Sequence, residues 1–244
     1  MTRARTPFRS LLLLSLLAAP LVSRPALAQT KTPAADLPAP EPEHGHPGFV
    51  FGVSVALSVP SGSATSAPGD TLSSTFAWQI PVTIDLGANI FPWLFLGAYG
   101  TIADGGPGSG IQPACWQDNC TQLSYRAGLV LEYRFLPGRR FEPWIGYGIG
   151  YDVSTQSTTA VNEFGYTEQR SFENFRGWDL AHARIGLDFL TDSFSAAGIF
   201  VDVSFGKFGN QYTQTGTAPG ADRSLADPTM HEWITIGARW TFMP

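Results

Sequence analysis

The clearest pattern in this sequence is a regular alternation of apolar and polar side chains over residues 76–90. Every second position from Phe76 to Ile90 is apolar, and the positions between them include Gln79, Thr83 and Asp85. Because successive side chains of a β-strand point to opposite faces, this segment predicts one long strand with one apolar face. Strands of soluble proteins are usually about 5–6 residues long, whereas a tilted strand that crosses a bilayer needs about 9–11 residues. The pattern is therefore typical of a membrane-spanning strand.

The same alternation recurs along the rest of the chain. The segments that carry it are 49–59, 75–90, 93–103, 121–135, 141–153, 175–190, 198–208 and 231–242. The connections after the second, fourth and sixth segments are short. The other four connections are long and polar, and they span 60–74, 104–120, 154–174 and 209–230.

Short turns at one end and long loops at the other are typical of outer-membrane barrels, with the turns in the periplasm and the loops outside. A soluble β-sandwich has no reason to sort its connection lengths in this way. We therefore predict an all-β fold, an eight-stranded antiparallel up-and-down transmembrane β-barrel. An even number of strands places both chain ends in the periplasm.

The residues before the first strand predict two further segments. Residues 1–28 combine a basic start, a short apolar run and the small-residue motif Ala26-Leu27-Ala28, which together are typical of a cleavable signal peptide. Residues 29–47 are rich in Pro and Ala, so we expect an extended periplasmic arm in which His44 and His46 are solvated. The barrel then spans residues 48–242.

The net charge of the chain argues against nucleic acid as a partner. The formal net charge is −5, and loss of the arginine-bearing signal peptide makes the mature chain more acidic. A chain without a basic patch lacks the phosphate contacts that nucleic-acid binding needs, so we expect no nucleic-acid partner.

The last predicted strand carries a recognisable spacing. Thr235, Gly237, Trp240 and Phe242 match, position for position, the terminal insertion signal of bacterial outer-membrane barrels, although the chain continues to Met243-Pro244. Residues 48–242 thus resemble the OmpA/OmpX-type family of small, eight-stranded outer-membrane barrels. The resemblance implies outer-membrane lipid and, through the last strand, the barrel-assembly machinery as partners, and it implies no cofactor.

Aromatic residues gather near the ends of the predicted strands. Trp and Tyr favour the bilayer interface, where one side of the ring stays wet. We therefore expect two aromatic girdles, and Trp178, Phe208 and Trp233 would join the girdle on the loop side. The residues predicted to form the girdles are Trp93, Phe135, Phe141, Tyr151 and Phe175.

Alternation also places charged side chains on the inner face of the strands. An eight-stranded barrel is just wide enough for side chains to fill it, and unpaired buried charges are costly, so we expect ion pairs across the lumen. The predicted network consists of Asp85, Arg126, Glu132, Arg184, Asp202 and Arg239. Neighbouring strands should join Arg184, Asp202 and Arg239 into one cluster. Glu132 would meet Arg126 or a partner across the lumen, and interior glycines either make room for large side chains or line a water-filled passage.

The two cysteines of the chain, Cys115 and Cys120, lie in the long connection after the third strand. In an oxidising compartment we expect them to form a disulfide, which would stiffen the loop by about 2 kcal/mol of chain entropy. No histidine lies near them in the sequence, so a metal site is not expected.

Three functions fit a barrel of this kind. The one we favour is a structural or surface-interaction protein whose four long loops contact an extracellular ligand that the sequence does not identify. The second is a small pore, or an OmpW-like conduit for small or hydrophobic solutes, which a charged and filled lumen argues against. The third is a lipid-modifying enzyme, but the His-x-Ser pair of eight-stranded lipid A deacylases is absent, and His182 and Ser204 point into the lumen. We therefore predict no catalytic residues.

Overall fold

The structure is a computed structural model that describes residues 48–65, 70–111, 115, 119–161, 167–216, 218–225 and 230–244, without the side chains of 160–170. The predicted signal peptide and periplasmic arm lie outside the described residues. Within the described ranges, no helix has the length and apolar character needed to cross a bilayer.

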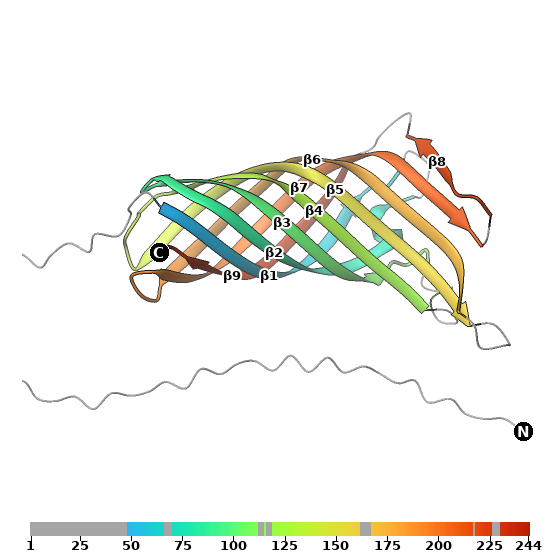
Figure 1. Ribbon diagram of the computed structural model, residues 1–244, viewed down its shortest axis with the longest axis horizontal. Helices are drawn as coiled ribbons and strands as arrows, with labels where there is room; N and C mark the ends of the chain where they lie inside the picture. Colours follow the sequence, from blue (N-terminus) through green and yellow to red (C-terminus); the bar gives the residue numbers. More distant parts are fainter. Residues whose placement is uncertain are drawn as a thin grey trace, which may run out of the picture. The chain divides into compact units, whose positions relative to one another are not determined.

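The strands form a single closed sheet (Figure 1). Their bounds are β1 Gly48–Gly62, β2 Phe76–Phe91, β3 Leu94–Pro107, β4 Asn119–Arg134, β5 Phe141–Val161, β6 Thr167–Leu190, β7 Ser195–Thr215, β8 Ala221–Ser224 and β9 Met230–Phe242, with one short helix, α1 Leu72–Thr75. Strands β1 to β7 each pair with the next, and β9 pairs with both β7 and β1, always antiparallel. This ring of eight strands confirms the predicted fold class.

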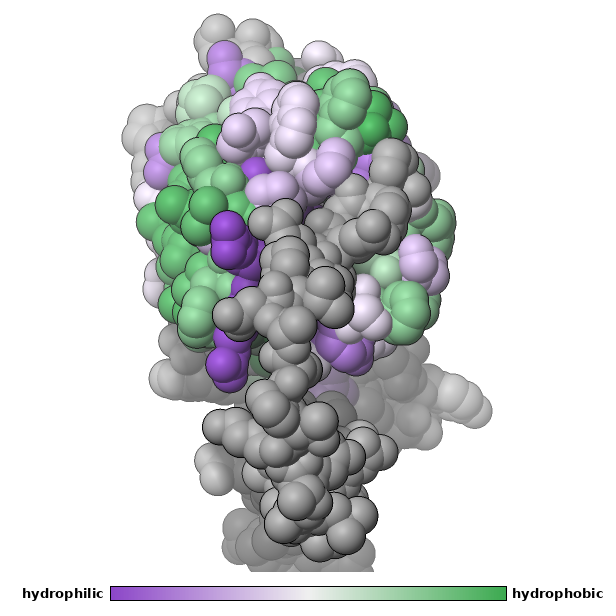
Figure 2. All heavy atoms as spheres, turned by 90° about the vertical axis from the view of Figure 1, so that its left-hand side faces the viewer, coloured by the Kyte–Doolittle hydropathy of each residue, from purple (hydrophilic) through white to green (hydrophobic). Residues whose placement is uncertain are grey.

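The barrel has its apolar side chains outside and its charged side chains inside. Ile84, Leu129 and Ile145 are exposed on the outer face, whereas Asp85 and Arg184 are buried. Seen from the end that lies at the left of Figure 1, the outer flanks are largely hydrophobic (Figure 2). Apolar outward faces and polar inward faces are the inverse of a soluble sandwich and suit a barrel surrounded by hydrocarbon.

The two ends of the barrel differ. The connections 92–93, 135–140 and 191–194 lie at one end, which we call the turn end, and the first residues of β1 and the last of β9 lie there too (Figure 1). The other end, which we call the loop end, carries the remaining connections. The sorting of connection lengths that the sequence predicts is therefore present.

The predicted loops 154–174 and 209–230 are wrong in their extent, because much of both segments is strand. Strand β5 continues to Val161 and pairs with β6 along its whole length, and β8 adds to β7 beyond the first residue of β9. These extensions protrude at the right of Figure 1. They are rich in Ser and Thr on both faces. The strands therefore continue beyond the point where the apolar alternation ends. Cross-strand Ser and Thr pairs stabilise such polar ribbons.

The predicted loop 60–74 also contains regular structure. Thr71 caps α1 by accepting a hydrogen bond from the Ser74 amide, with 3.2 Å between N and Oγ1. The helix places Leu72 in the lumen, where the side chain is fully buried. This segment is therefore part of the barrel interior at the loop end.

Candidate functional site

The lumen is the candidate site, because the predicted network residues lie there and all are buried. From the turn end to the loop end they form successive layers, which we name after the arginine in each. The Arg239 layer contains Glu132, Trp144 and Asp188. The Arg184 layer contains Asp85, Tyr99, Asp179, His182 and Asp202, and the Arg126 layer contains Asp152, Ser154 and Trp233.

In the Arg239 layer one guanidinium from β9 bridges two carboxylates, one on β4 and one on β6. Arg239 Nη1 donates to Glu132 Oε1 at 2.8 Å, while Nη2 and Nε donate to Asp188 at 2.6 and 2.9 Å. The guanidinium also lies 3.5 Å above the centroid of the Trp144 ring, whose Nε1 donates to Asp188 at 3.2 Å. All these side chains are buried, so this layer crosses the lumen with paired charges.

Gly198 explains why Arg239 pairs with Asp188. The sequence had predicted Asp202 as the partner. In the β7–β9 register Arg239 lies opposite Gly198, and Asp202 lies opposite Thr235, four residues away. Gly198 in turn lies opposite Asp188 on β6. A Cβ at position 198 would lie 2.0 Å from Asp188 Oδ1, so only glycine lets this pair form across β7. The expected Arg–Asp–Arg cluster is therefore replaced by two layers that share Glu132.

The Arg184 layer lies in the middle of the barrel. Arg184 contacts Asp85 and Asp202 at 3.2 Å each, and Glu132 at 3.9 Å. The imidazole of His182 contacts Asp202 through Nε2 and lies 3.5 Å from Asp179 through Nδ1.

Tyr99 closes the Arg184 layer on the side of β3. Its hydroxyl donates to Asp179 at 3.3 Å, and the Arg184 guanidinium lies 5.4 Å from its ring centroid. Every ionisable group of this layer thus faces another, which is what burial of charge in a low-dielectric interior requires.

The Arg126 layer shares no described ion pair with the other two layers. Arg126 contacts Asp152 at 3.4 Å and lies 4.9 Å from the centroid of the Trp233 ring. The β4–β5 register explains this pairing, because it places Arg126 directly opposite Asp152. Glu132 lies opposite Gly146, farther toward the turn end. Of the two partners considered for Glu132, the structure therefore places it against Arg239 and not against Arg126.

The turn end has its own small set of contacts. Arg134 lies 3.8 Å from Glu142, and Arg134 Nη1 donates to the Met243 sulfur at 2.9 Å. Met243 packs against a buried cluster that includes Phe95 and Val130. A cavity of about 320 Å³ remains beside these residues, between Met243 and the short connections.

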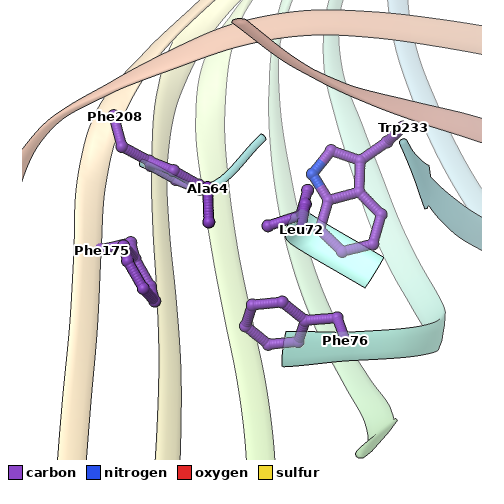
Figure 3. Packing of buried hydrophobic residues seen from close by; sticks show 6 residues of the cluster. All are labelled: Ala64, Leu72, Phe76, Phe175, Phe208 and Trp233. Carbon is purple, nitrogen blue, oxygen red and sulfur yellow. The ribbon is translucent and has the colours of Figure 1, made fainter. Parts of the chain in front are cut away.

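An apolar cluster fills the loop end of the lumen. It consists of Ala64, Leu72, Phe76, Phe175, Phe208 and Trp233 and is called here the loop-end cluster. Figure 3 shows Leu72 of α1 pointing among the aromatic rings that come from the barrel wall. The rings of Phe175 and Phe208 lie 5.3 Å apart, and those of Phe76 and Trp233 lie 5.9 Å apart.

The loop-end cluster corrects the predicted girdle. Phe175, Phe208 and Trp233, which were expected at the lipid interface, are buried in the lumen. For Phe175 the reason is a β-bulge, because Asp179 lies opposite Gly206 and Ala181 lies opposite Phe205, which leaves Leu180 as an extra residue. The extra residue reverses the inward and outward positions of β6 between its two ends.

The other predicted girdle residues lie on the outer face. The exposed rings at the turn end are Trp93, Phe135 and Phe141, and Tyr151 lies toward the loop end. Trp178 lies on the outer face as expected, where it is exposed and packs edge-on against Tyr151 at 5.5 Å between centroids.

The residues of the predicted insertion signal divide between the two faces of β9. Thr235 is buried in the lumen and shares a hydrogen bond of 2.8 Å with Ser58 on β1. Trp240 and Phe242 are exposed on the outer face, with stacked rings 6.1 Å apart. At Gly237, a Cβ would lie 2.5 Å from that of Ala56, so the backbones of β9 and β1 come close there.

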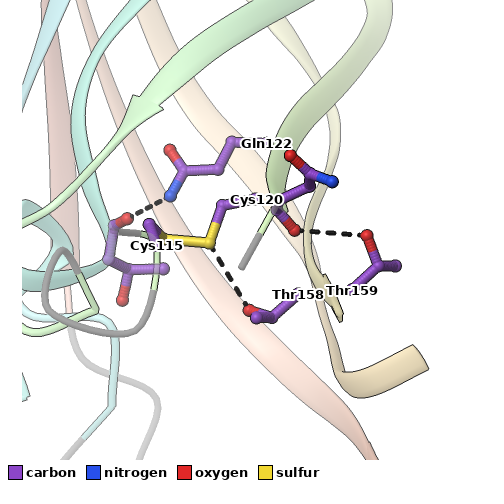
Figure 4. The surroundings of a disulfide bond; sticks show 7 residues. Cys115, Cys120, Gln122, Thr158 and Thr159 are labelled. Atoms are coloured by element: carbon purple, nitrogen blue, oxygen red, sulfur yellow. Dashed lines mark hydrogen bonds between the residues drawn. A yellow bond between two sulfur atoms is a disulfide. The ribbon is translucent and has the colours of Figure 1, made fainter. Parts of the chain in front are cut away.

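The predicted disulfide between Cys115 and Cys120 is present (Figure 4). It lies close to contacts that hold α1. Gln122, two residues after Cys120, donates to the Thr75 carbonyl at 2.7 Å, and the Gly108 and Gly110 amides donate to the Thr75 and Ser74 carbonyls at 2.9 Å each. The connection that the disulfide closes is therefore bonded to the segment that fills the loop end.

Comparison with known proteins gives matches among solved structures alone, since no family model and no curated protein matches. The chain is similar to Neisserial surface protein A, with 12% identity over 78% of this chain and 95% of that chain and a TM-score of 0.43. It is also similar to a major outer membrane protein from Thermus thermophilus, with 11% identity, coverage of 80% and 99%, and a TM-score of 0.47. A third similar structure is Ail, the attachment invasion locus protein of Yersinia pestis, in complex with the heparin analogue sucrose octasulfate, with 12% identity, coverage of 80% and 99%, and a TM-score of 0.41.

Proposed function

We propose that this chain is an integral bacterial outer-membrane protein that presents its loop end at the cell surface for interaction, and that it neither catalyses a reaction nor conducts solutes. The observation that carries the proposal is the lumen, in which buried ion pairs and an apolar cluster succeed one another along the barrel axis. Outside, the wall is apolar, as contact with hydrocarbon requires.

The proposed topology follows from the position of the short connections. In outer-membrane barrels short turns face the periplasm, so the turn end and both termini would lie there. Lipid would then surround the outer face, and the assembly machinery would receive β9, whose Trp240 and Phe242 carry the predicted insertion signal.

The loop end is the part that would meet a partner. Strands β5, β6 and β7 extend beyond the apolar band, and β8 widens the sheet with four exposed residues. Binding residues concentrate on segments held by a rigid scaffold, and here the scaffold includes hydrogen-bonded strand extensions as well as connections.

A closed lumen can be tested by electrical recording. The purified barrel, refolded into planar bilayers, should give rare and small openings, because the layers around Arg239 and Arg184 cross the lumen in succession. Frequent, large and sustained openings would contradict a non-conducting role.

The topology has a separate test in intact cells. External protease should cut within the loop-end connections and leave 135–140 and 191–194 uncut. Permeabilised cells provide the control, because the turn end then becomes accessible. Cleavage of the turn end in intact cells would reverse the proposed orientation.

The contacts of His182 support a non-catalytic role. Its two ring nitrogens face Asp202 and Asp179, and no described hydrogen bond joins the ring to Ser204 on the neighbouring strand. We expect a His182→Ala variant to change the stability of the barrel. Loss of a lipid-hydrolysing activity in that variant would instead identify an enzyme.

A further inference from the structure

We propose that the outer face of β6 and β7 carries a binding site for the phosphate of a lipid headgroup, built around Arg176 with Lys207 beside it. The proposal rests on the membrane placement given above and adds to it a ligand class and a location.

Arg176 lies on the lipid-facing side of β6, at the border of the apolar band. Along this strand Phe175 faces the lumen, Arg176 is exposed, Gly177 is buried and Trp178 is 62% exposed. Trp178 packs edge-on against Tyr151. Trp and Tyr favour the headgroup level of a bilayer. Arg176, one outward position nearer the loop end, therefore lies at the depth of lipid phosphates.

Lys207 supplies a second positive charge on the adjacent strand. It lies opposite Trp178 in the β6–β7 register, and its neighbours Gly206 and Phe208 are buried. Glu232 on β9 shares this outer face, opposite Phe205. Among the described residues, neither Arg176 nor Lys207 forms an ion pair with a carboxylate. The local charge is thus available to an anion.

A buried side chain fixes the orientation of Arg176. Arg176 Nε donates to Asn174 Oδ1 at 2.6 Å, and Asn174 Nδ2 donates to Thr155 Oγ1 at 2.9 Å. Asn174 is 6% exposed, so this chain of bonds anchors the exposed guanidinium to the wall. Arg176 is therefore a positioned group, unlike a surface arginine that samples many rotamers.

The geometry favours phosphate as the ligand. A guanidinium presents a planar fork of donors that matches the oxygens of a phosphate, and the bonds to an anion are strong. The described contact of Arg176 uses Nε, which leaves both Nη groups to face the headgroup. Below this point Trp178 and Leu180 are exposed and apolar, so the acyl chains of the same lipid have a surface to follow.

The proposal can be tested by native mass spectrometry of the detergent-solubilised barrel with phosphatidic acid and with diacylglycerol, which has no phosphate. The unmodified chain should retain phosphatidic acid in preference. Arg176→Gln should weaken that binding about tenfold, as expected for loss of a charge-assisted hydrogen bond. Asn174→Ala keeps every charge but frees the guanidinium, so it should produce a smaller loss. Lys207→Gln should also weaken binding.

Arg140→Gln is the matched control, because Arg140 is an exposed arginine in a connection at the turn end. It should leave phosphatidic acid binding unchanged. Equal retention of the two lipids, or equal losses for Arg140→Gln and Arg176→Gln, would overturn the site. A barrel that fails to insert into vesicles would overturn the proposed function itself, whereas an inserted barrel without lipid preference would overturn this inference alone.

Discussion

Gly198 shows how a residue without a side chain can decide an ion pair. It lies between Asp188 and Arg239 on neighbouring strands, and the two side chains meet across it. We expect Gly198→Ala to displace the Asp188 carboxylate and to destabilise the barrel by about 3 kcal/mol, the cost of separating a buried pair. Urea unfolding of the barrel in vesicles would measure the change.

Gly100→Ala is the matched control for that substitution. Gly100 is an exposed strand glycine, and a Cβ built there meets no atom within 4 Å. Its free energy of unfolding should stay within about 0.5 kcal/mol of the unmodified chain, as for most surface substitutions. Equal losses for the two variants would show that the space beside Asp188 does not matter.

The Arg239 layer should respond unequally to the loss of its members. Arg239→Met leaves the carboxylates of Glu132 and Asp188 without their shared cation and should cost about 3–5 kcal/mol. Glu132→Gln leaves Arg239 with both of its bonds to Asp188, so the loss should be clearly smaller. The same unfolding measurement compares the two, and a Glu132→Gln variant as unstable as Arg239→Met would contradict this order.

Alternation predicts each strand of the barrel, but it does not predict for every residue whether the side chain faces the lumen or the outer face. Phe208 has the same parity as Asp202 on β7, so consistent counting from the charged residues would have placed it in the lumen. Phe175 could not be placed in this way, because the bulge at Leu180 depends on pairing with β7 and leaves no mark in the hydropathy. The polar extensions of β5 and β6 were missed for a similar reason, since pairing and not an apolar face holds them.

The connection that carries the disulfide is bonded to the end of α1. The Gly108 and Gly110 amides and Gln122 all donate to the last carbonyls of α1, so the connection supports the helix that carries Leu72. Replacing both cysteines by serine should cost about 2 kcal/mol or less. It should accelerate proteolysis within 104–120 while the β-sheet content, followed by circular dichroism, stays unchanged.

The proteolysis result needs a reference point. Cleavage within the turn-end connection 135–140 should keep its rate in the double serine variant. Gln122→Ala, which removes one anchor of α1 and keeps the disulfide, should give an intermediate rate. If the serine variant is cut no faster than the unmodified chain, the disulfide does not support α1.

The ion-pair layers and the loop-end cluster follow one another along the barrel axis, and each of them obstructs the lumen. The sequence predicted the charges in the lumen because parity places them there, and it paired Arg184 with Asp202 correctly by strand adjacency. It could not assign Arg239 to Asp188, because that pairing depends on strand stagger and on the gap at Gly198. The apolar layer was also missed, since Leu72 reaches the lumen through the fold of a connection.

Layers in series predict how conductance depends on combined substitutions. Arg239→Ala together with Trp144→Ala opens the layer nearest the turn end, but the Arg184 layer and the loop-end cluster still obstruct the lumen, so planar bilayer recordings should stay nearly silent. Leu72→Ser with Phe175→Ala loosens the loop end and should be equally silent by itself. Conductance should rise most when both pairs of substitutions are combined with Arg184→Ala and Arg126→Ala, because every layer is then reduced. A turn-end double variant that conducts as well as the full combination would show that one layer alone closes the barrel.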